Sequence, residues 1–468
     1  MSTATSGGWG TLSNEKEFSS MVSKLNIEEN AEKETGDDKP DIPDAADSSL
    51  IAKIFRKGLT NDKCSLEVQR KDPNNPLYSV KTFEALKLHP DLLRGVYAMG
   101  FNVPSKIQET TLPILLANPP TNLIAQSQSG TGKTAAFVLA MLSRVDTSKN
   151  FVQALCLSPT YELAIQTGEV AAKMSQYRKD IQLRFAVRGE EAPKDTKLTE
   201  HIVIGTPGKV LDWGVKFKVF DMKKITVFVL DEADLMIATQ GHQDQCHRIH
   251  KQLSNKCQMM FFSATYGQEV MEFAELIVPN PTILRLKREQ ESLENIKQYY
   301  VRCANHEAKY AAITNIYGGI SIGQAIIFCH TRKTCSWLSA KMSQDGHSVA
   351  ILSGDLNVEQ RIAVLDRFRA GLEKVLITTN VLSRGIDVEQ VTIVVNFDMP
   401  KDGENKADCD TYLHRIGRTG RFGKSGIAVN LIDSEESMTI CKDIERHFNK
   451  PILKIDTDNP EEIENIQS

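Results

Sequence analysis

The feature that most constrains the fold of this 468-residue chain is a strand, turn and helix pattern that repeats along it. Short apolar runs recur in the first half, and each is followed by small or polar residues and then by a helical stretch. These runs are NLIA at 122–125, ALCL at 154–157, IVIG at 202–205, VFVL at 227–230 and MMFF at 259–262. Strands that alternate with helices in this way predict a parallel sheet with helices on both faces.

A second series of the same kind begins near residue 296. Its runs are YYVRC at 299–303, AIIFC at 325–329, VAILS at 349–353, VLIT at 375–378, VTIVV at 391–395 and IAVNLI at 427–432. The charged stretch KREQESLEN at 287–295 separates the two series, and we interpret it as a linker. We therefore predict an α/β protein with two tandem lobes, each a mostly parallel sheet flanked by helices, on a hinge that lets them close on a ligand.

The domain boundaries follow from these patterns and from the composition of the ends. Residues 1–47 are polar, and between Glu28 and Asp47 nine acidic residues stand against two lysines, so we expect a disordered acidic tail. The remaining predicted segments are an amphipathic helix and linker at 48–69, a first lobe at 70–286, the linker at 287–295, a second lobe at 296–456 and a C-terminal tail at 457–468.

Two interpretations of the N-terminal helix stay open. Leu50, Ile51, Ile54 and Phe55 share one face of the helix expected at about 47–59. The helix either packs against the first lobe, which we favour, or moves into the cleft between the lobes and opposes their closure. Both stay open because amphipathicity alone does not show where a helix docks.

Composition is typical of a soluble globular protein. Hydrophobic residues make up 41% of the chain, charged residues make up 25%, and the net charge is −4. No apolar run approaches the roughly 20 residues of a membrane span, and the start MSTATSGGWG lacks the features of a secretory signal. Nine scattered cysteines without a CxxC pair favour free thiols in a reducing compartment. We therefore expect a cytoplasmic and nuclear protein without membrane contact.

One stretch carries zinc-type ligands, namely His242, Cys246, His247, His250 and Cys257. His242, Cys246 and His250 fall at helical spacing, and no turn separates two ligand pairs. Because structural zinc sites usually take their ligands from such pairs, we interpret the stretch as the surface of a helix.

The strongest local motif follows the run NLIA and precedes a helical stretch. It consists of Ser127, Gln128, Ser129, Gly130, Thr131, Gly132, Lys133 and Thr134. Glycines let backbone N–H groups curl around phosphates at a helix N-terminus, while Lys133 reaches the β- and γ-phosphates and Thr134 ligates magnesium. The strict pattern has glycine where this chain has Ser127, but the strand-to-helix context supports an ATP-phosphate loop.

A second motif, Asp231 and Glu232, follows the run VFVL. An acidic residue at a strand end suits the magnesium ion of bound ATP, and Glu232 can act as general base for the attacking water. A solvated acidic turn would be the alternative if the motif stood alone, but a phosphate loop lies roughly one hundred residues upstream. We therefore predict Lys133, Asp231 and Glu232 as catalytic residues, with Thr134 and Asp231 as magnesium ligands.

Further segments make the chain resemble the DEAD-box RNA helicases from Phe83 to the end of the second lobe. In family order they are GFNVPSKIQ at 100–108, the phosphate loop, PTYELA at 159–164, TPG at 206–208, DEAD at 231–234, SAT at 263–265, FCHT at 328–331, TNVLSRGID at 379–387 and HRIGRTGR at 414–421. Any one segment is common, whereas the ordered set is hard to obtain by chance. The resemblance implies two RecA-like lobes, ATP-dependent RNA helicase activity and the cofactors ATP and Mg²⁺.

The resemblance also implies roles around the nucleotide. Gln108 resembles the glutamine that reads adenine, Phe101 would stack on the base, and Phe83 would either support it or pack in the core. Arg418 and Arg421 resemble the arginines that reach the γ-phosphate from the second lobe, the alternative being a solvated basic helix face.

Other implied nucleotide residues are Gly385 and Asp387, with Asp387 on the ribose. The residues implied to couple the ATP state to lobe closure are Asp234, Ser263, Thr265 and His414.

The residues that the resemblance places on RNA are Pro159, Thr160, Gly189, Thr206, Pro207 and Gly208 in the first lobe and Thr331, Arg332 and Thr379 in the second. Contacts to the sugar–phosphate backbone do not read sequence, and contacts to 2′-hydroxyls favour RNA over DNA. The chain departs from the family at Tyr161 and Lys209, where arginine is usual, and at Arg188, where glycine is usual. These departures bear on the RNA contacts and not on the ATP chemistry.

Tyr161 and the segments AQSQSGTGKT, PLYSVKTFEAL and MIATQGHQDQ are similar to the nuclear-pore, mRNA-export branch, to which a germ-cell cousin is close. This implies binding of single-stranded RNA without sequence preference, a nucleoporin and an inositol-phosphate-assisted activator, a place at the cytoplasmic face of the pore, and a monomeric state. Two alternatives stay open. They are an ATP-gated RNA clamp that acts as a scaffold, and a translation-initiation helicase, which would usually carry arginine in place of Tyr161.

Overall fold

The computed structural model describes most of the chain. The described residues are 66–69, 79–126, 131–193, 196–265, 267–286, 295–320, 322–380, 388, 390–420 and 425–467. The predicted tail at 1–47, the helix expected at about 47–59 and the linker at 287–295, apart from its last residue, therefore lie outside the described residues.

The first sheet has the strand order β1-β8-β2-β7-β6-β3-β5-β4. Its strands are β1 (Leu66–Gln69), β2 (Leu123–Gln126), β3 (Ala154–Leu157), β4 (Leu183–Ala186), β5 (Ile202–Gly205), β6 (Val227–Leu230), β7 (Gln258–Ser263) and β8 (Thr282–Leu286). All neighbouring pairs are parallel except β1 and β8, which pair antiparallel. The five apolar runs predicted as strands in this half form β2, β3, β5, β6 and β7, so the predicted parallel sheet is confirmed.

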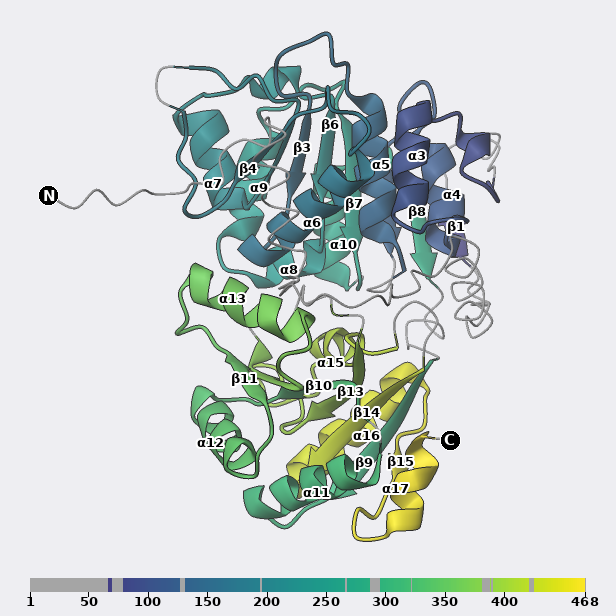
Figure 1. The fold of residues 1–468 in the computed structure, drawn as a ribbon. Coiled ribbons are helices and arrows are strands. Elements are labelled where there is room, and N and C mark those ends of the chain that lie inside the picture. The colour runs from purple at the N-terminus through teal and green to yellow at the C-terminus, as the bar shows by residue number, and fades with distance from the viewer. Residues whose placement is uncertain are drawn as a thin grey trace, which may run out of the picture.

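Helices cover both faces of this sheet (Figure 1). They are η1 (Glu84–Leu86), α3 (Pro90–Ala98), α4 (Lys106–Leu115), α5 (Lys133–Arg144), α6 (Tyr161–Met174), α7 (Pro207–Leu211), η2 (Asp212–Lys216), η3 (Met222–Lys224), α8 (Ala233–Ala238), α9 (His242–His250) and α10 (Gln268–Ile277). Alternate strand side chains enter two separate cores: in β6, Val227 and Val229 pack under α3 to α6, whereas Phe228 and Leu230 pack under α7 to α10. The two-residue period of a strand thus explains why these runs are apolar throughout.

Strand β1 differs from the sequence prediction, which placed residues 48–69 in a helix and linker. Residues 66–69 instead join the first sheet, with Leu66 paired with Leu286 and Gln69 with Ile283. Pairing with β8 satisfies backbone groups that an open sheet edge would leave exposed, and this long-range contact is not visible in a four-residue segment.

The second sheet is parallel throughout, in the order β11-β12-β10-β13-β14-β9-β15. Its strands are β9 (Ile296–Arg302), β10 (Gln324–Phe328), β11 (Val349–Leu352), β12 (Val375–Thr378), β13 (Val391–Asn396), β14 (Gly426–Ile432) and β15 (Leu453–Lys454). Its helices are α11 (His306–Gly319), α12 (Arg332–Gln344), α13 (Val358–Arg369), α15 (Cys409–Ile416), α16 (Glu435–Phe448) and α17 (Pro460–Gln467). Each apolar run of the second series forms a strand of this sheet, so the two-lobe fold is confirmed.

Helix α17 corrects the prediction of a C-terminal tail at 457–468. Ile463 and Ile466 of this helix are buried in the core that α11 also lines. A side chain added at Gly319 of α11 would lie 2.6 Å from Ile463, so the two helices approach closely because this position has no Cβ. The second lobe therefore extends to the end of α17.

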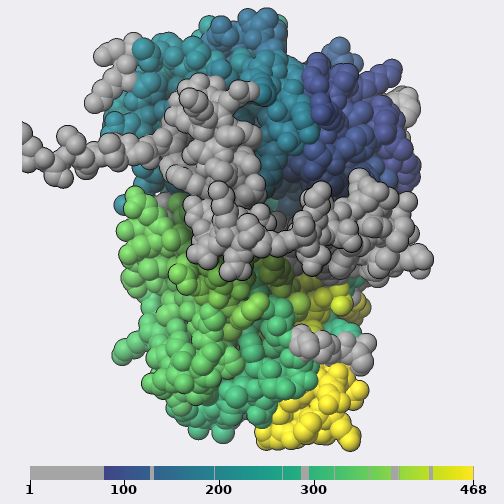
Figure 2. All heavy atoms as spheres, viewed as in Figure 1, coloured from purple at the N-terminus to yellow at the C-terminus, as the bar shows by residue number. Residues whose placement is uncertain are grey.

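The two lobes lie against each other, and side chains of both meet at the boundary between them. Figure 1 shows the first lobe, purple to teal, above the second, green to yellow, with α13 and α15 at the boundary. In the space-filling view the green surface of the second lobe adjoins the teal surface of the first (Figure 2). Among the described residues, His414 Nε2 lies 2.6 Å from Asp234 Oδ2 across the boundary, and Arg361 Nε lies 3.3 Å from Glu162 Oε1. Among the described residues, no helix is both long and apolar enough to cross a bilayer.

Candidate functional site

The residues that the sequence singles out gather where parallel strands of the first sheet end. Lys133 begins the helix after β2, Asp231 and Glu232 follow β6, and Thr265 follows β7. Ligands of open α/β sheets bind at this edge because loops and helix N-termini converge there. The site therefore lies where the topology of the fold predicts it.

The phosphate-loop end is built around Gly132 and Gln108. Gly132 has a φ of +99°, a left-handed conformation that favours glycine, and a Cβ there would lie 2.6 Å from Gln108 Nε2. Gln108 Nε2 donates to the Gly132 carbonyl at 3.1 Å, and Gln108 Oε1 accepts from the Ser105 amide at 2.9 Å. Gln108, the predicted adenine reader, thus also supports the phosphate loop. Lys133 is buried, with its Nζ 4.0 Å from Glu232 Oε1, and Thr134 follows it, half-buried.

The acidic pair is buried and locally strained. Glu232 has a φ of +47°, which is uncommon for a residue with a side chain and is typical of functional sites. Its backbone amide donates to Asp231 Oδ1 at 3.0 Å. Burial, followed by the neighbouring charge of Glu232, raises the pKa of Asp231 to about 7, although Lys133 opposes the shift.

A divalent cation fits this end of the site. Glu232 Oε2 is buried and has no hydrogen-bond partner among the described residues, and Asp231 is a buried carboxyl with a raised pKa. Carboxylate and hydroxyl oxygens are ligands that Mg²⁺ accepts, and a bound cation would return the pKa of Asp231 toward its ordinary value.

The predicted coupling residues form one buried network across the lobes. Asp234 Oδ2 lies 2.6 Å from His414 Nε2 and accepts from Thr265 Oγ1 at 3.3 Å. The Asp234 amide donates to Ser263 Oγ at 3.3 Å, and Ser263 Oγ donates to the Thr265 carbonyl at 2.8 Å. The ligand atoms of Glu232, Asp234 and His414 lie within 4.8 Å of one another. A histidine of the second lobe thus reaches the acidic motif of the first.

Arg418 and the aromatic residues complete the described part of the nucleotide side. Arg418 follows α15 and is buried, and its Nε donates to the His414 carbonyl at 2.9 Å, so the arginine and the histidine are held together. Phe101 is half-buried against the first core, whereas Phe83 is fully buried in it, which favours the packing alternative for Phe83. The predicted nucleotide residues outside the described residues are Ser127, Gln128, Ser129, Gly130, Gly385, Asp387 and Arg421.

The residues predicted to bind RNA lie at loops and helix N-termini of both lobes. Thr160 Oγ1 accepts from the Leu163 amide at 3.3 Å at the start of α6, and Thr331 Oγ1 accepts from the Thr334 amide at 3.1 Å at the start of α12. Helix N-termini carry a partial positive charge that attracts phosphates. The others are Pro159 before α6; Thr206, Pro207 and Gly208 at the start of α7; Gly189, exposed with a φ of +94°; Arg332, ion-paired with Asp355; and Thr379, which follows β12.

The residues that depart from the family pattern all lie in the first lobe. Tyr161 is the first residue of α6 and is half-buried. Lys209 Nζ donates to the Glu190 carbonyl at 2.7 Å, so this lysine holds the loop that follows Gly189. Arg188 is exposed.

The stretch with zinc-type ligands is only partly a helix surface. It forms α9, but Cys246 lies in the second core of the first lobe, and burial raises the pKa of its thiol to about 12. Cys257, beyond the helix, is buried in the same core. The prediction of a helix surface was therefore wrong for these two cysteines. A cysteine binds a metal as a thiolate, and burial in an apolar core favours the neutral thiol, so both cysteines suit packing.

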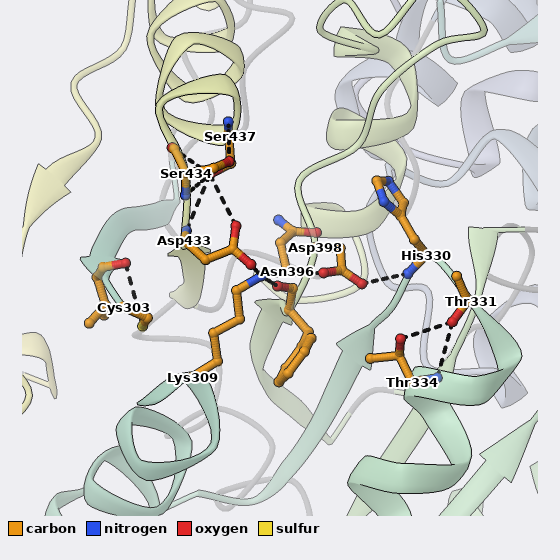
Figure 3. A network of polar contacts seen from close by, with 12 residues as sticks. Cys303, Lys309, His330, Thr331, Thr334, Asn396, Asp398, Asp433, Ser434 and Ser437 are labelled. Atoms are coloured by element: carbon orange, nitrogen blue, oxygen red, sulfur yellow. Dashed lines mark hydrogen bonds and ion pairs between the residues drawn. The ribbon is translucent and has the colours of Figure 1, made fainter. Parts of the chain in front are cut away.

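Sequence reasoning missed a buried polar network in the second lobe, of which Figure 3 shows the part around Lys309 and Asp398. Its centre is Arg415, which is fully buried and donates to Asn380 Oδ1 at 2.9 Å, Asn396 Oδ1 at 2.8 Å and the Asp398 carbonyl at 2.7 Å. The segment HRIGRTGR gave a signal for Arg415. Lys309 joins the same network from α11, where nothing in the sequence distinguishes it from a surface lysine.

A DEAD/DEAH box helicase model matches residues 105–273, and a helicase conserved C-terminal domain model matches residues 308–423. The DEAD-box helicase Dbp80 of Drosophila melanogaster is 68% identical over 98% of this chain and 99% of its own length. The ATP-dependent RNA helicase DDX19A of Homo sapiens is 60% identical over 92% of this chain and 90% of its own length.

Two solved structures of S. cerevisiae Dbp5 are similar in fold. Dbp5 bound to RNA and ADP BeF3 has a TM-score of 0.78 and 46% identity, covering 83% of this chain and 98% of that one. A Dbp5 variant bound to Nup159, Gle1, IP6 and ADP has a TM-score of 0.63 and 44% identity, covering 81% of this chain and 98% of that one.

Proposed function

This chain belongs to the DEAD-box family of ATP-dependent RNA helicases, and we propose that it closes its lobes on ATP and RNA and reopens them after hydrolysis. The observation that carries the proposal is the 2.6 Å contact between His414 and Asp234, because it joins the ATP side of one lobe to the arginine helix of the other. Closure bends the bound RNA, and so separates a short duplex or displaces a bound protein. Release of phosphate then resets the lobes without translocation.

Hydrolysis uses residues from both lobes. Lys133 holds the β- and γ-phosphates, Glu232 takes a proton from the attacking water, and Arg418 with Arg421 stabilises the charge on the transferred phosphoryl group. Thr134 and Asp231 would hold Mg²⁺, which neutralises phosphate charge when bound. The distance of 4.0 Å between Lys133 Nζ and Glu232 Oε1 supports this arrangement.

The remaining residues bind the base, the phosphates and RNA. Gln108 and Phe101 take the adenine, the backbone from Ser127 to Thr134 cradles the phosphates, and Gly385 with Asp387 contacts the ribose side. The RNA backbone lies along the N-termini of α6, α7 and α12, where helix dipoles and capping threonines face phosphates. RNA is thus bound without reading its sequence.

We further propose that the pathway is mRNA export, at the cytoplasmic face of the nuclear pore. Support comes from Dbp5, whose solved complex contains Nup159, Gle1 and IP6 and whose chain is 44% identical. By this likeness the chain binds a nucleoporin and an inositol-phosphate-assisted activator, in the cytoplasm and the nucleus. Tyr161, in place of the usual arginine, favours this branch over a translation-initiation helicase.

The test is steady-state ATP hydrolysis with and without single-stranded RNA, with single-stranded DNA for comparison. We expect RNA to stimulate turnover at least tenfold and DNA to have little effect, while Glu232→Gln loses roughly 10² to 10⁴ of the rate as expected for a general base. Glu275→Gln, a change at an exposed carboxylate on α10, is the matched control. RNA binding that depends on ATP but does not stimulate turnover would instead favour the scaffold clamp.

A further inference from the structure

Lys309 of α11 is almost completely buried, with 1% of its surface exposed. Its ammonium group donates to the Phe397 carbonyl at 2.7 Å and lies 2.8 Å from Asp433 Oδ2 and 3.3 Å from Asp398 Oδ1. It also lies 5.0 Å from the centre of the Phe397 ring. Figure 3 shows the lysine reaching from α11 to the ends of two strands.

A buried ammonium group is costly unless it is paired and hydrogen-bonded, and a well-packed apolar side chain often fills the same volume at no loss of stability. Packing alone therefore does not explain a lysine at this position. Its contacts connect two carboxylates, Asp398 after β13 and Asp433 after β14. Without the cation, the two acidic groups would face each other in a half-buried space.

Asp398 contacts both the predicted RNA side and the predicted nucleotide side of the second lobe. Its Oδ2 accepts from the His330 amide at 2.8 Å, one residue before Thr331, which caps α12. Its backbone carbonyl accepts from Arg415 of α15 at 2.7 Å. The same residue therefore joins the predicted RNA loop of the second lobe to the helix that precedes Arg418.

These two contacts depend on Lys309 to different degrees. The carboxylate that accepts from His330 is the group that Lys309 holds, so its orientation depends on the lysine. The bond from Arg415 uses the backbone of Asp398 and is supported by Asn380 and Asn396, so we expect it to persist without the lysine. Loss of Lys309 should therefore affect the RNA side more than the nucleotide side.

We propose that Lys309 is a positioning residue: by fixing Asp398, it holds the RNA-binding end of α12 in register with α15. The inference rests on the proposed function, since it assigns the start of α12 to RNA and the end of α15 to ATP. Lys309 itself touches neither ligand. Its effect is carried by the Asp398 carboxylate and the His330 amide.

The experiment measures ATP hydrolysis by the full chain against the concentration of single-stranded RNA, at saturating Mg²⁺ and ATP. For Lys309→Met, an apolar side chain of similar length, we expect the RNA concentration at half-maximal rate to rise about tenfold, with kcat at saturating RNA changed less than about twofold. The affinity for ADP without RNA is expected to match that of the unchanged chain. Lys309→Arg, which keeps the charge, should restore most of the RNA affinity.

Two control variants distinguish the positioning of Asp398 by Lys309 from a general effect of losing a charge near α11. Lys341→Met removes a cation that also pairs with α11, through Glu307, but has no contact with Asp398 among the described residues. Asp433→Asn removes the other carboxylate partner of Lys309 and leaves the Asp398 contact in place. Neither is expected to change the RNA concentration at half-maximal rate by more than about twofold.

The outcomes decide the inference in each case. An unchanged RNA dependence for Lys309→Met, or an equal increase for Asp433→Asn, would overturn it. If Lys309→Met does not fold, Asp398→Asn decides, because it weakens the bond to His330 while Lys309 stays: a raised RNA requirement supports the proposal and an unchanged one rejects it. If RNA does not stimulate the unchanged chain, the proposed function fails instead, which distinguishes the two failures.

Discussion

At the scale of single residues, the surroundings of Asp231 favour the protonated form of its carboxyl group. Asp231 is buried beside Glu232 and within the reach of Lys133, and its pKa is raised to about 7 from the usual 3.8. Between about pH 4 and pH 7 the native carboxyl therefore keeps a proton that the unfolded chain has lost. The native state binds more protons in this window, so its free energy of unfolding falls as the pH rises.

This linkage predicts the effect of Asp231→Asn on the protein without nucleotide or magnesium. The variant should gain stability over the unchanged chain as the pH is raised from 5 to 8, by about 1–3 kcal/mol in the first lobe. Denaturant unfolding at the two pH values measures the difference. Asp244→Asn, at an exposed carboxylate of α9 in the same lobe, is the matched control. A constant difference between Asp231→Asn and the unchanged chain would contradict the shift.

The sequence singled out the residues that gather at the strand edge, but not the residues that support them. Lys133, Asp231 and Glu232 belong to short patterns whose chemistry is local, and the structure brings them to one strand edge. Lys309 and Asp398 come together from positions 89 residues apart. Each is an ordinary residue in its own segment, so only the folded chain reveals the pair. Gln108 was predicted for its amide, but its bond to the Gly132 carbonyl joins positions 24 residues apart and is visible only in the folded chain.

At the scale of elements, the apolar runs predicted the strands of both sheets, whereas the weaker patterns of β1 and α17 did not predict those two elements. Runs such as VFVL are apolar throughout because both faces of the strand are covered, and each became a strand. In contrast, α17 has two buried apolar residues, Ile463 and Ile466, in a highly acidic segment, which resembles a solvated tail. Its folding depends on the small residue Gly319 of α11, which lies far away in sequence.

Helix α17 should therefore contribute to the stability of the second lobe. Ile463→Ala removes a buried side chain from the core and is expected to cost about 2–4 kcal/mol of unfolding free energy. Glu464→Ala, on the exposed face of the same helix, should cost less than about 0.5 kcal/mol. Chemical denaturation of the full chain, followed by a second-lobe probe such as Trp337 fluorescence, measures both. Equal, small effects of the two changes would mean that the helix is dispensable.

At the scale of the whole molecule, two contacts between the lobes have different chemistry. His414 meets Asp234 inside the proposed catalytic network, so we expect a change of either residue to alter hydrolysis as well as closure. Arg361 of α13 meets Glu162 of α6 outside that network, with side chains that are 19% and 12% exposed. We therefore expect the second pair to report on closure separately from hydrolysis. Because both groups are partly withdrawn from water, their attraction is screened less than that of a surface pair.

The Arg361 and Glu162 pair should contribute to the coupling between ATP and RNA. A double-mutant cycle with Arg361→Gln and Glu162→Gln, measured as RNA affinity in the presence of ADP BeF3, should give a coupling energy of about 0.5–2 kcal/mol. With ADP alone, which we expect to leave the lobes apart, the cycle should give a value close to zero. Glu307→Gln and Lys341→Gln, a pair within the second lobe, form the matched cycle and should show no nucleotide dependence.

Binding linkage makes this prediction stricter, since coupling between two ligands is reciprocal. ADP BeF3 raises the affinity for RNA by some factor, and RNA raises the affinity for ADP BeF3 by the same factor. If Arg361→Gln lowers one of these factors, it must lower the other equally. Measuring both affinities therefore tests whether the ion pair acts through closure or through a local effect on RNA. A loss of RNA affinity that is the same with ADP and with ADP BeF3, and leaves nucleotide affinity unchanged, would place Arg361 on the RNA surface. Equal losses in both directions would identify α13 and α6 as a contact that forms only when both ligands are bound.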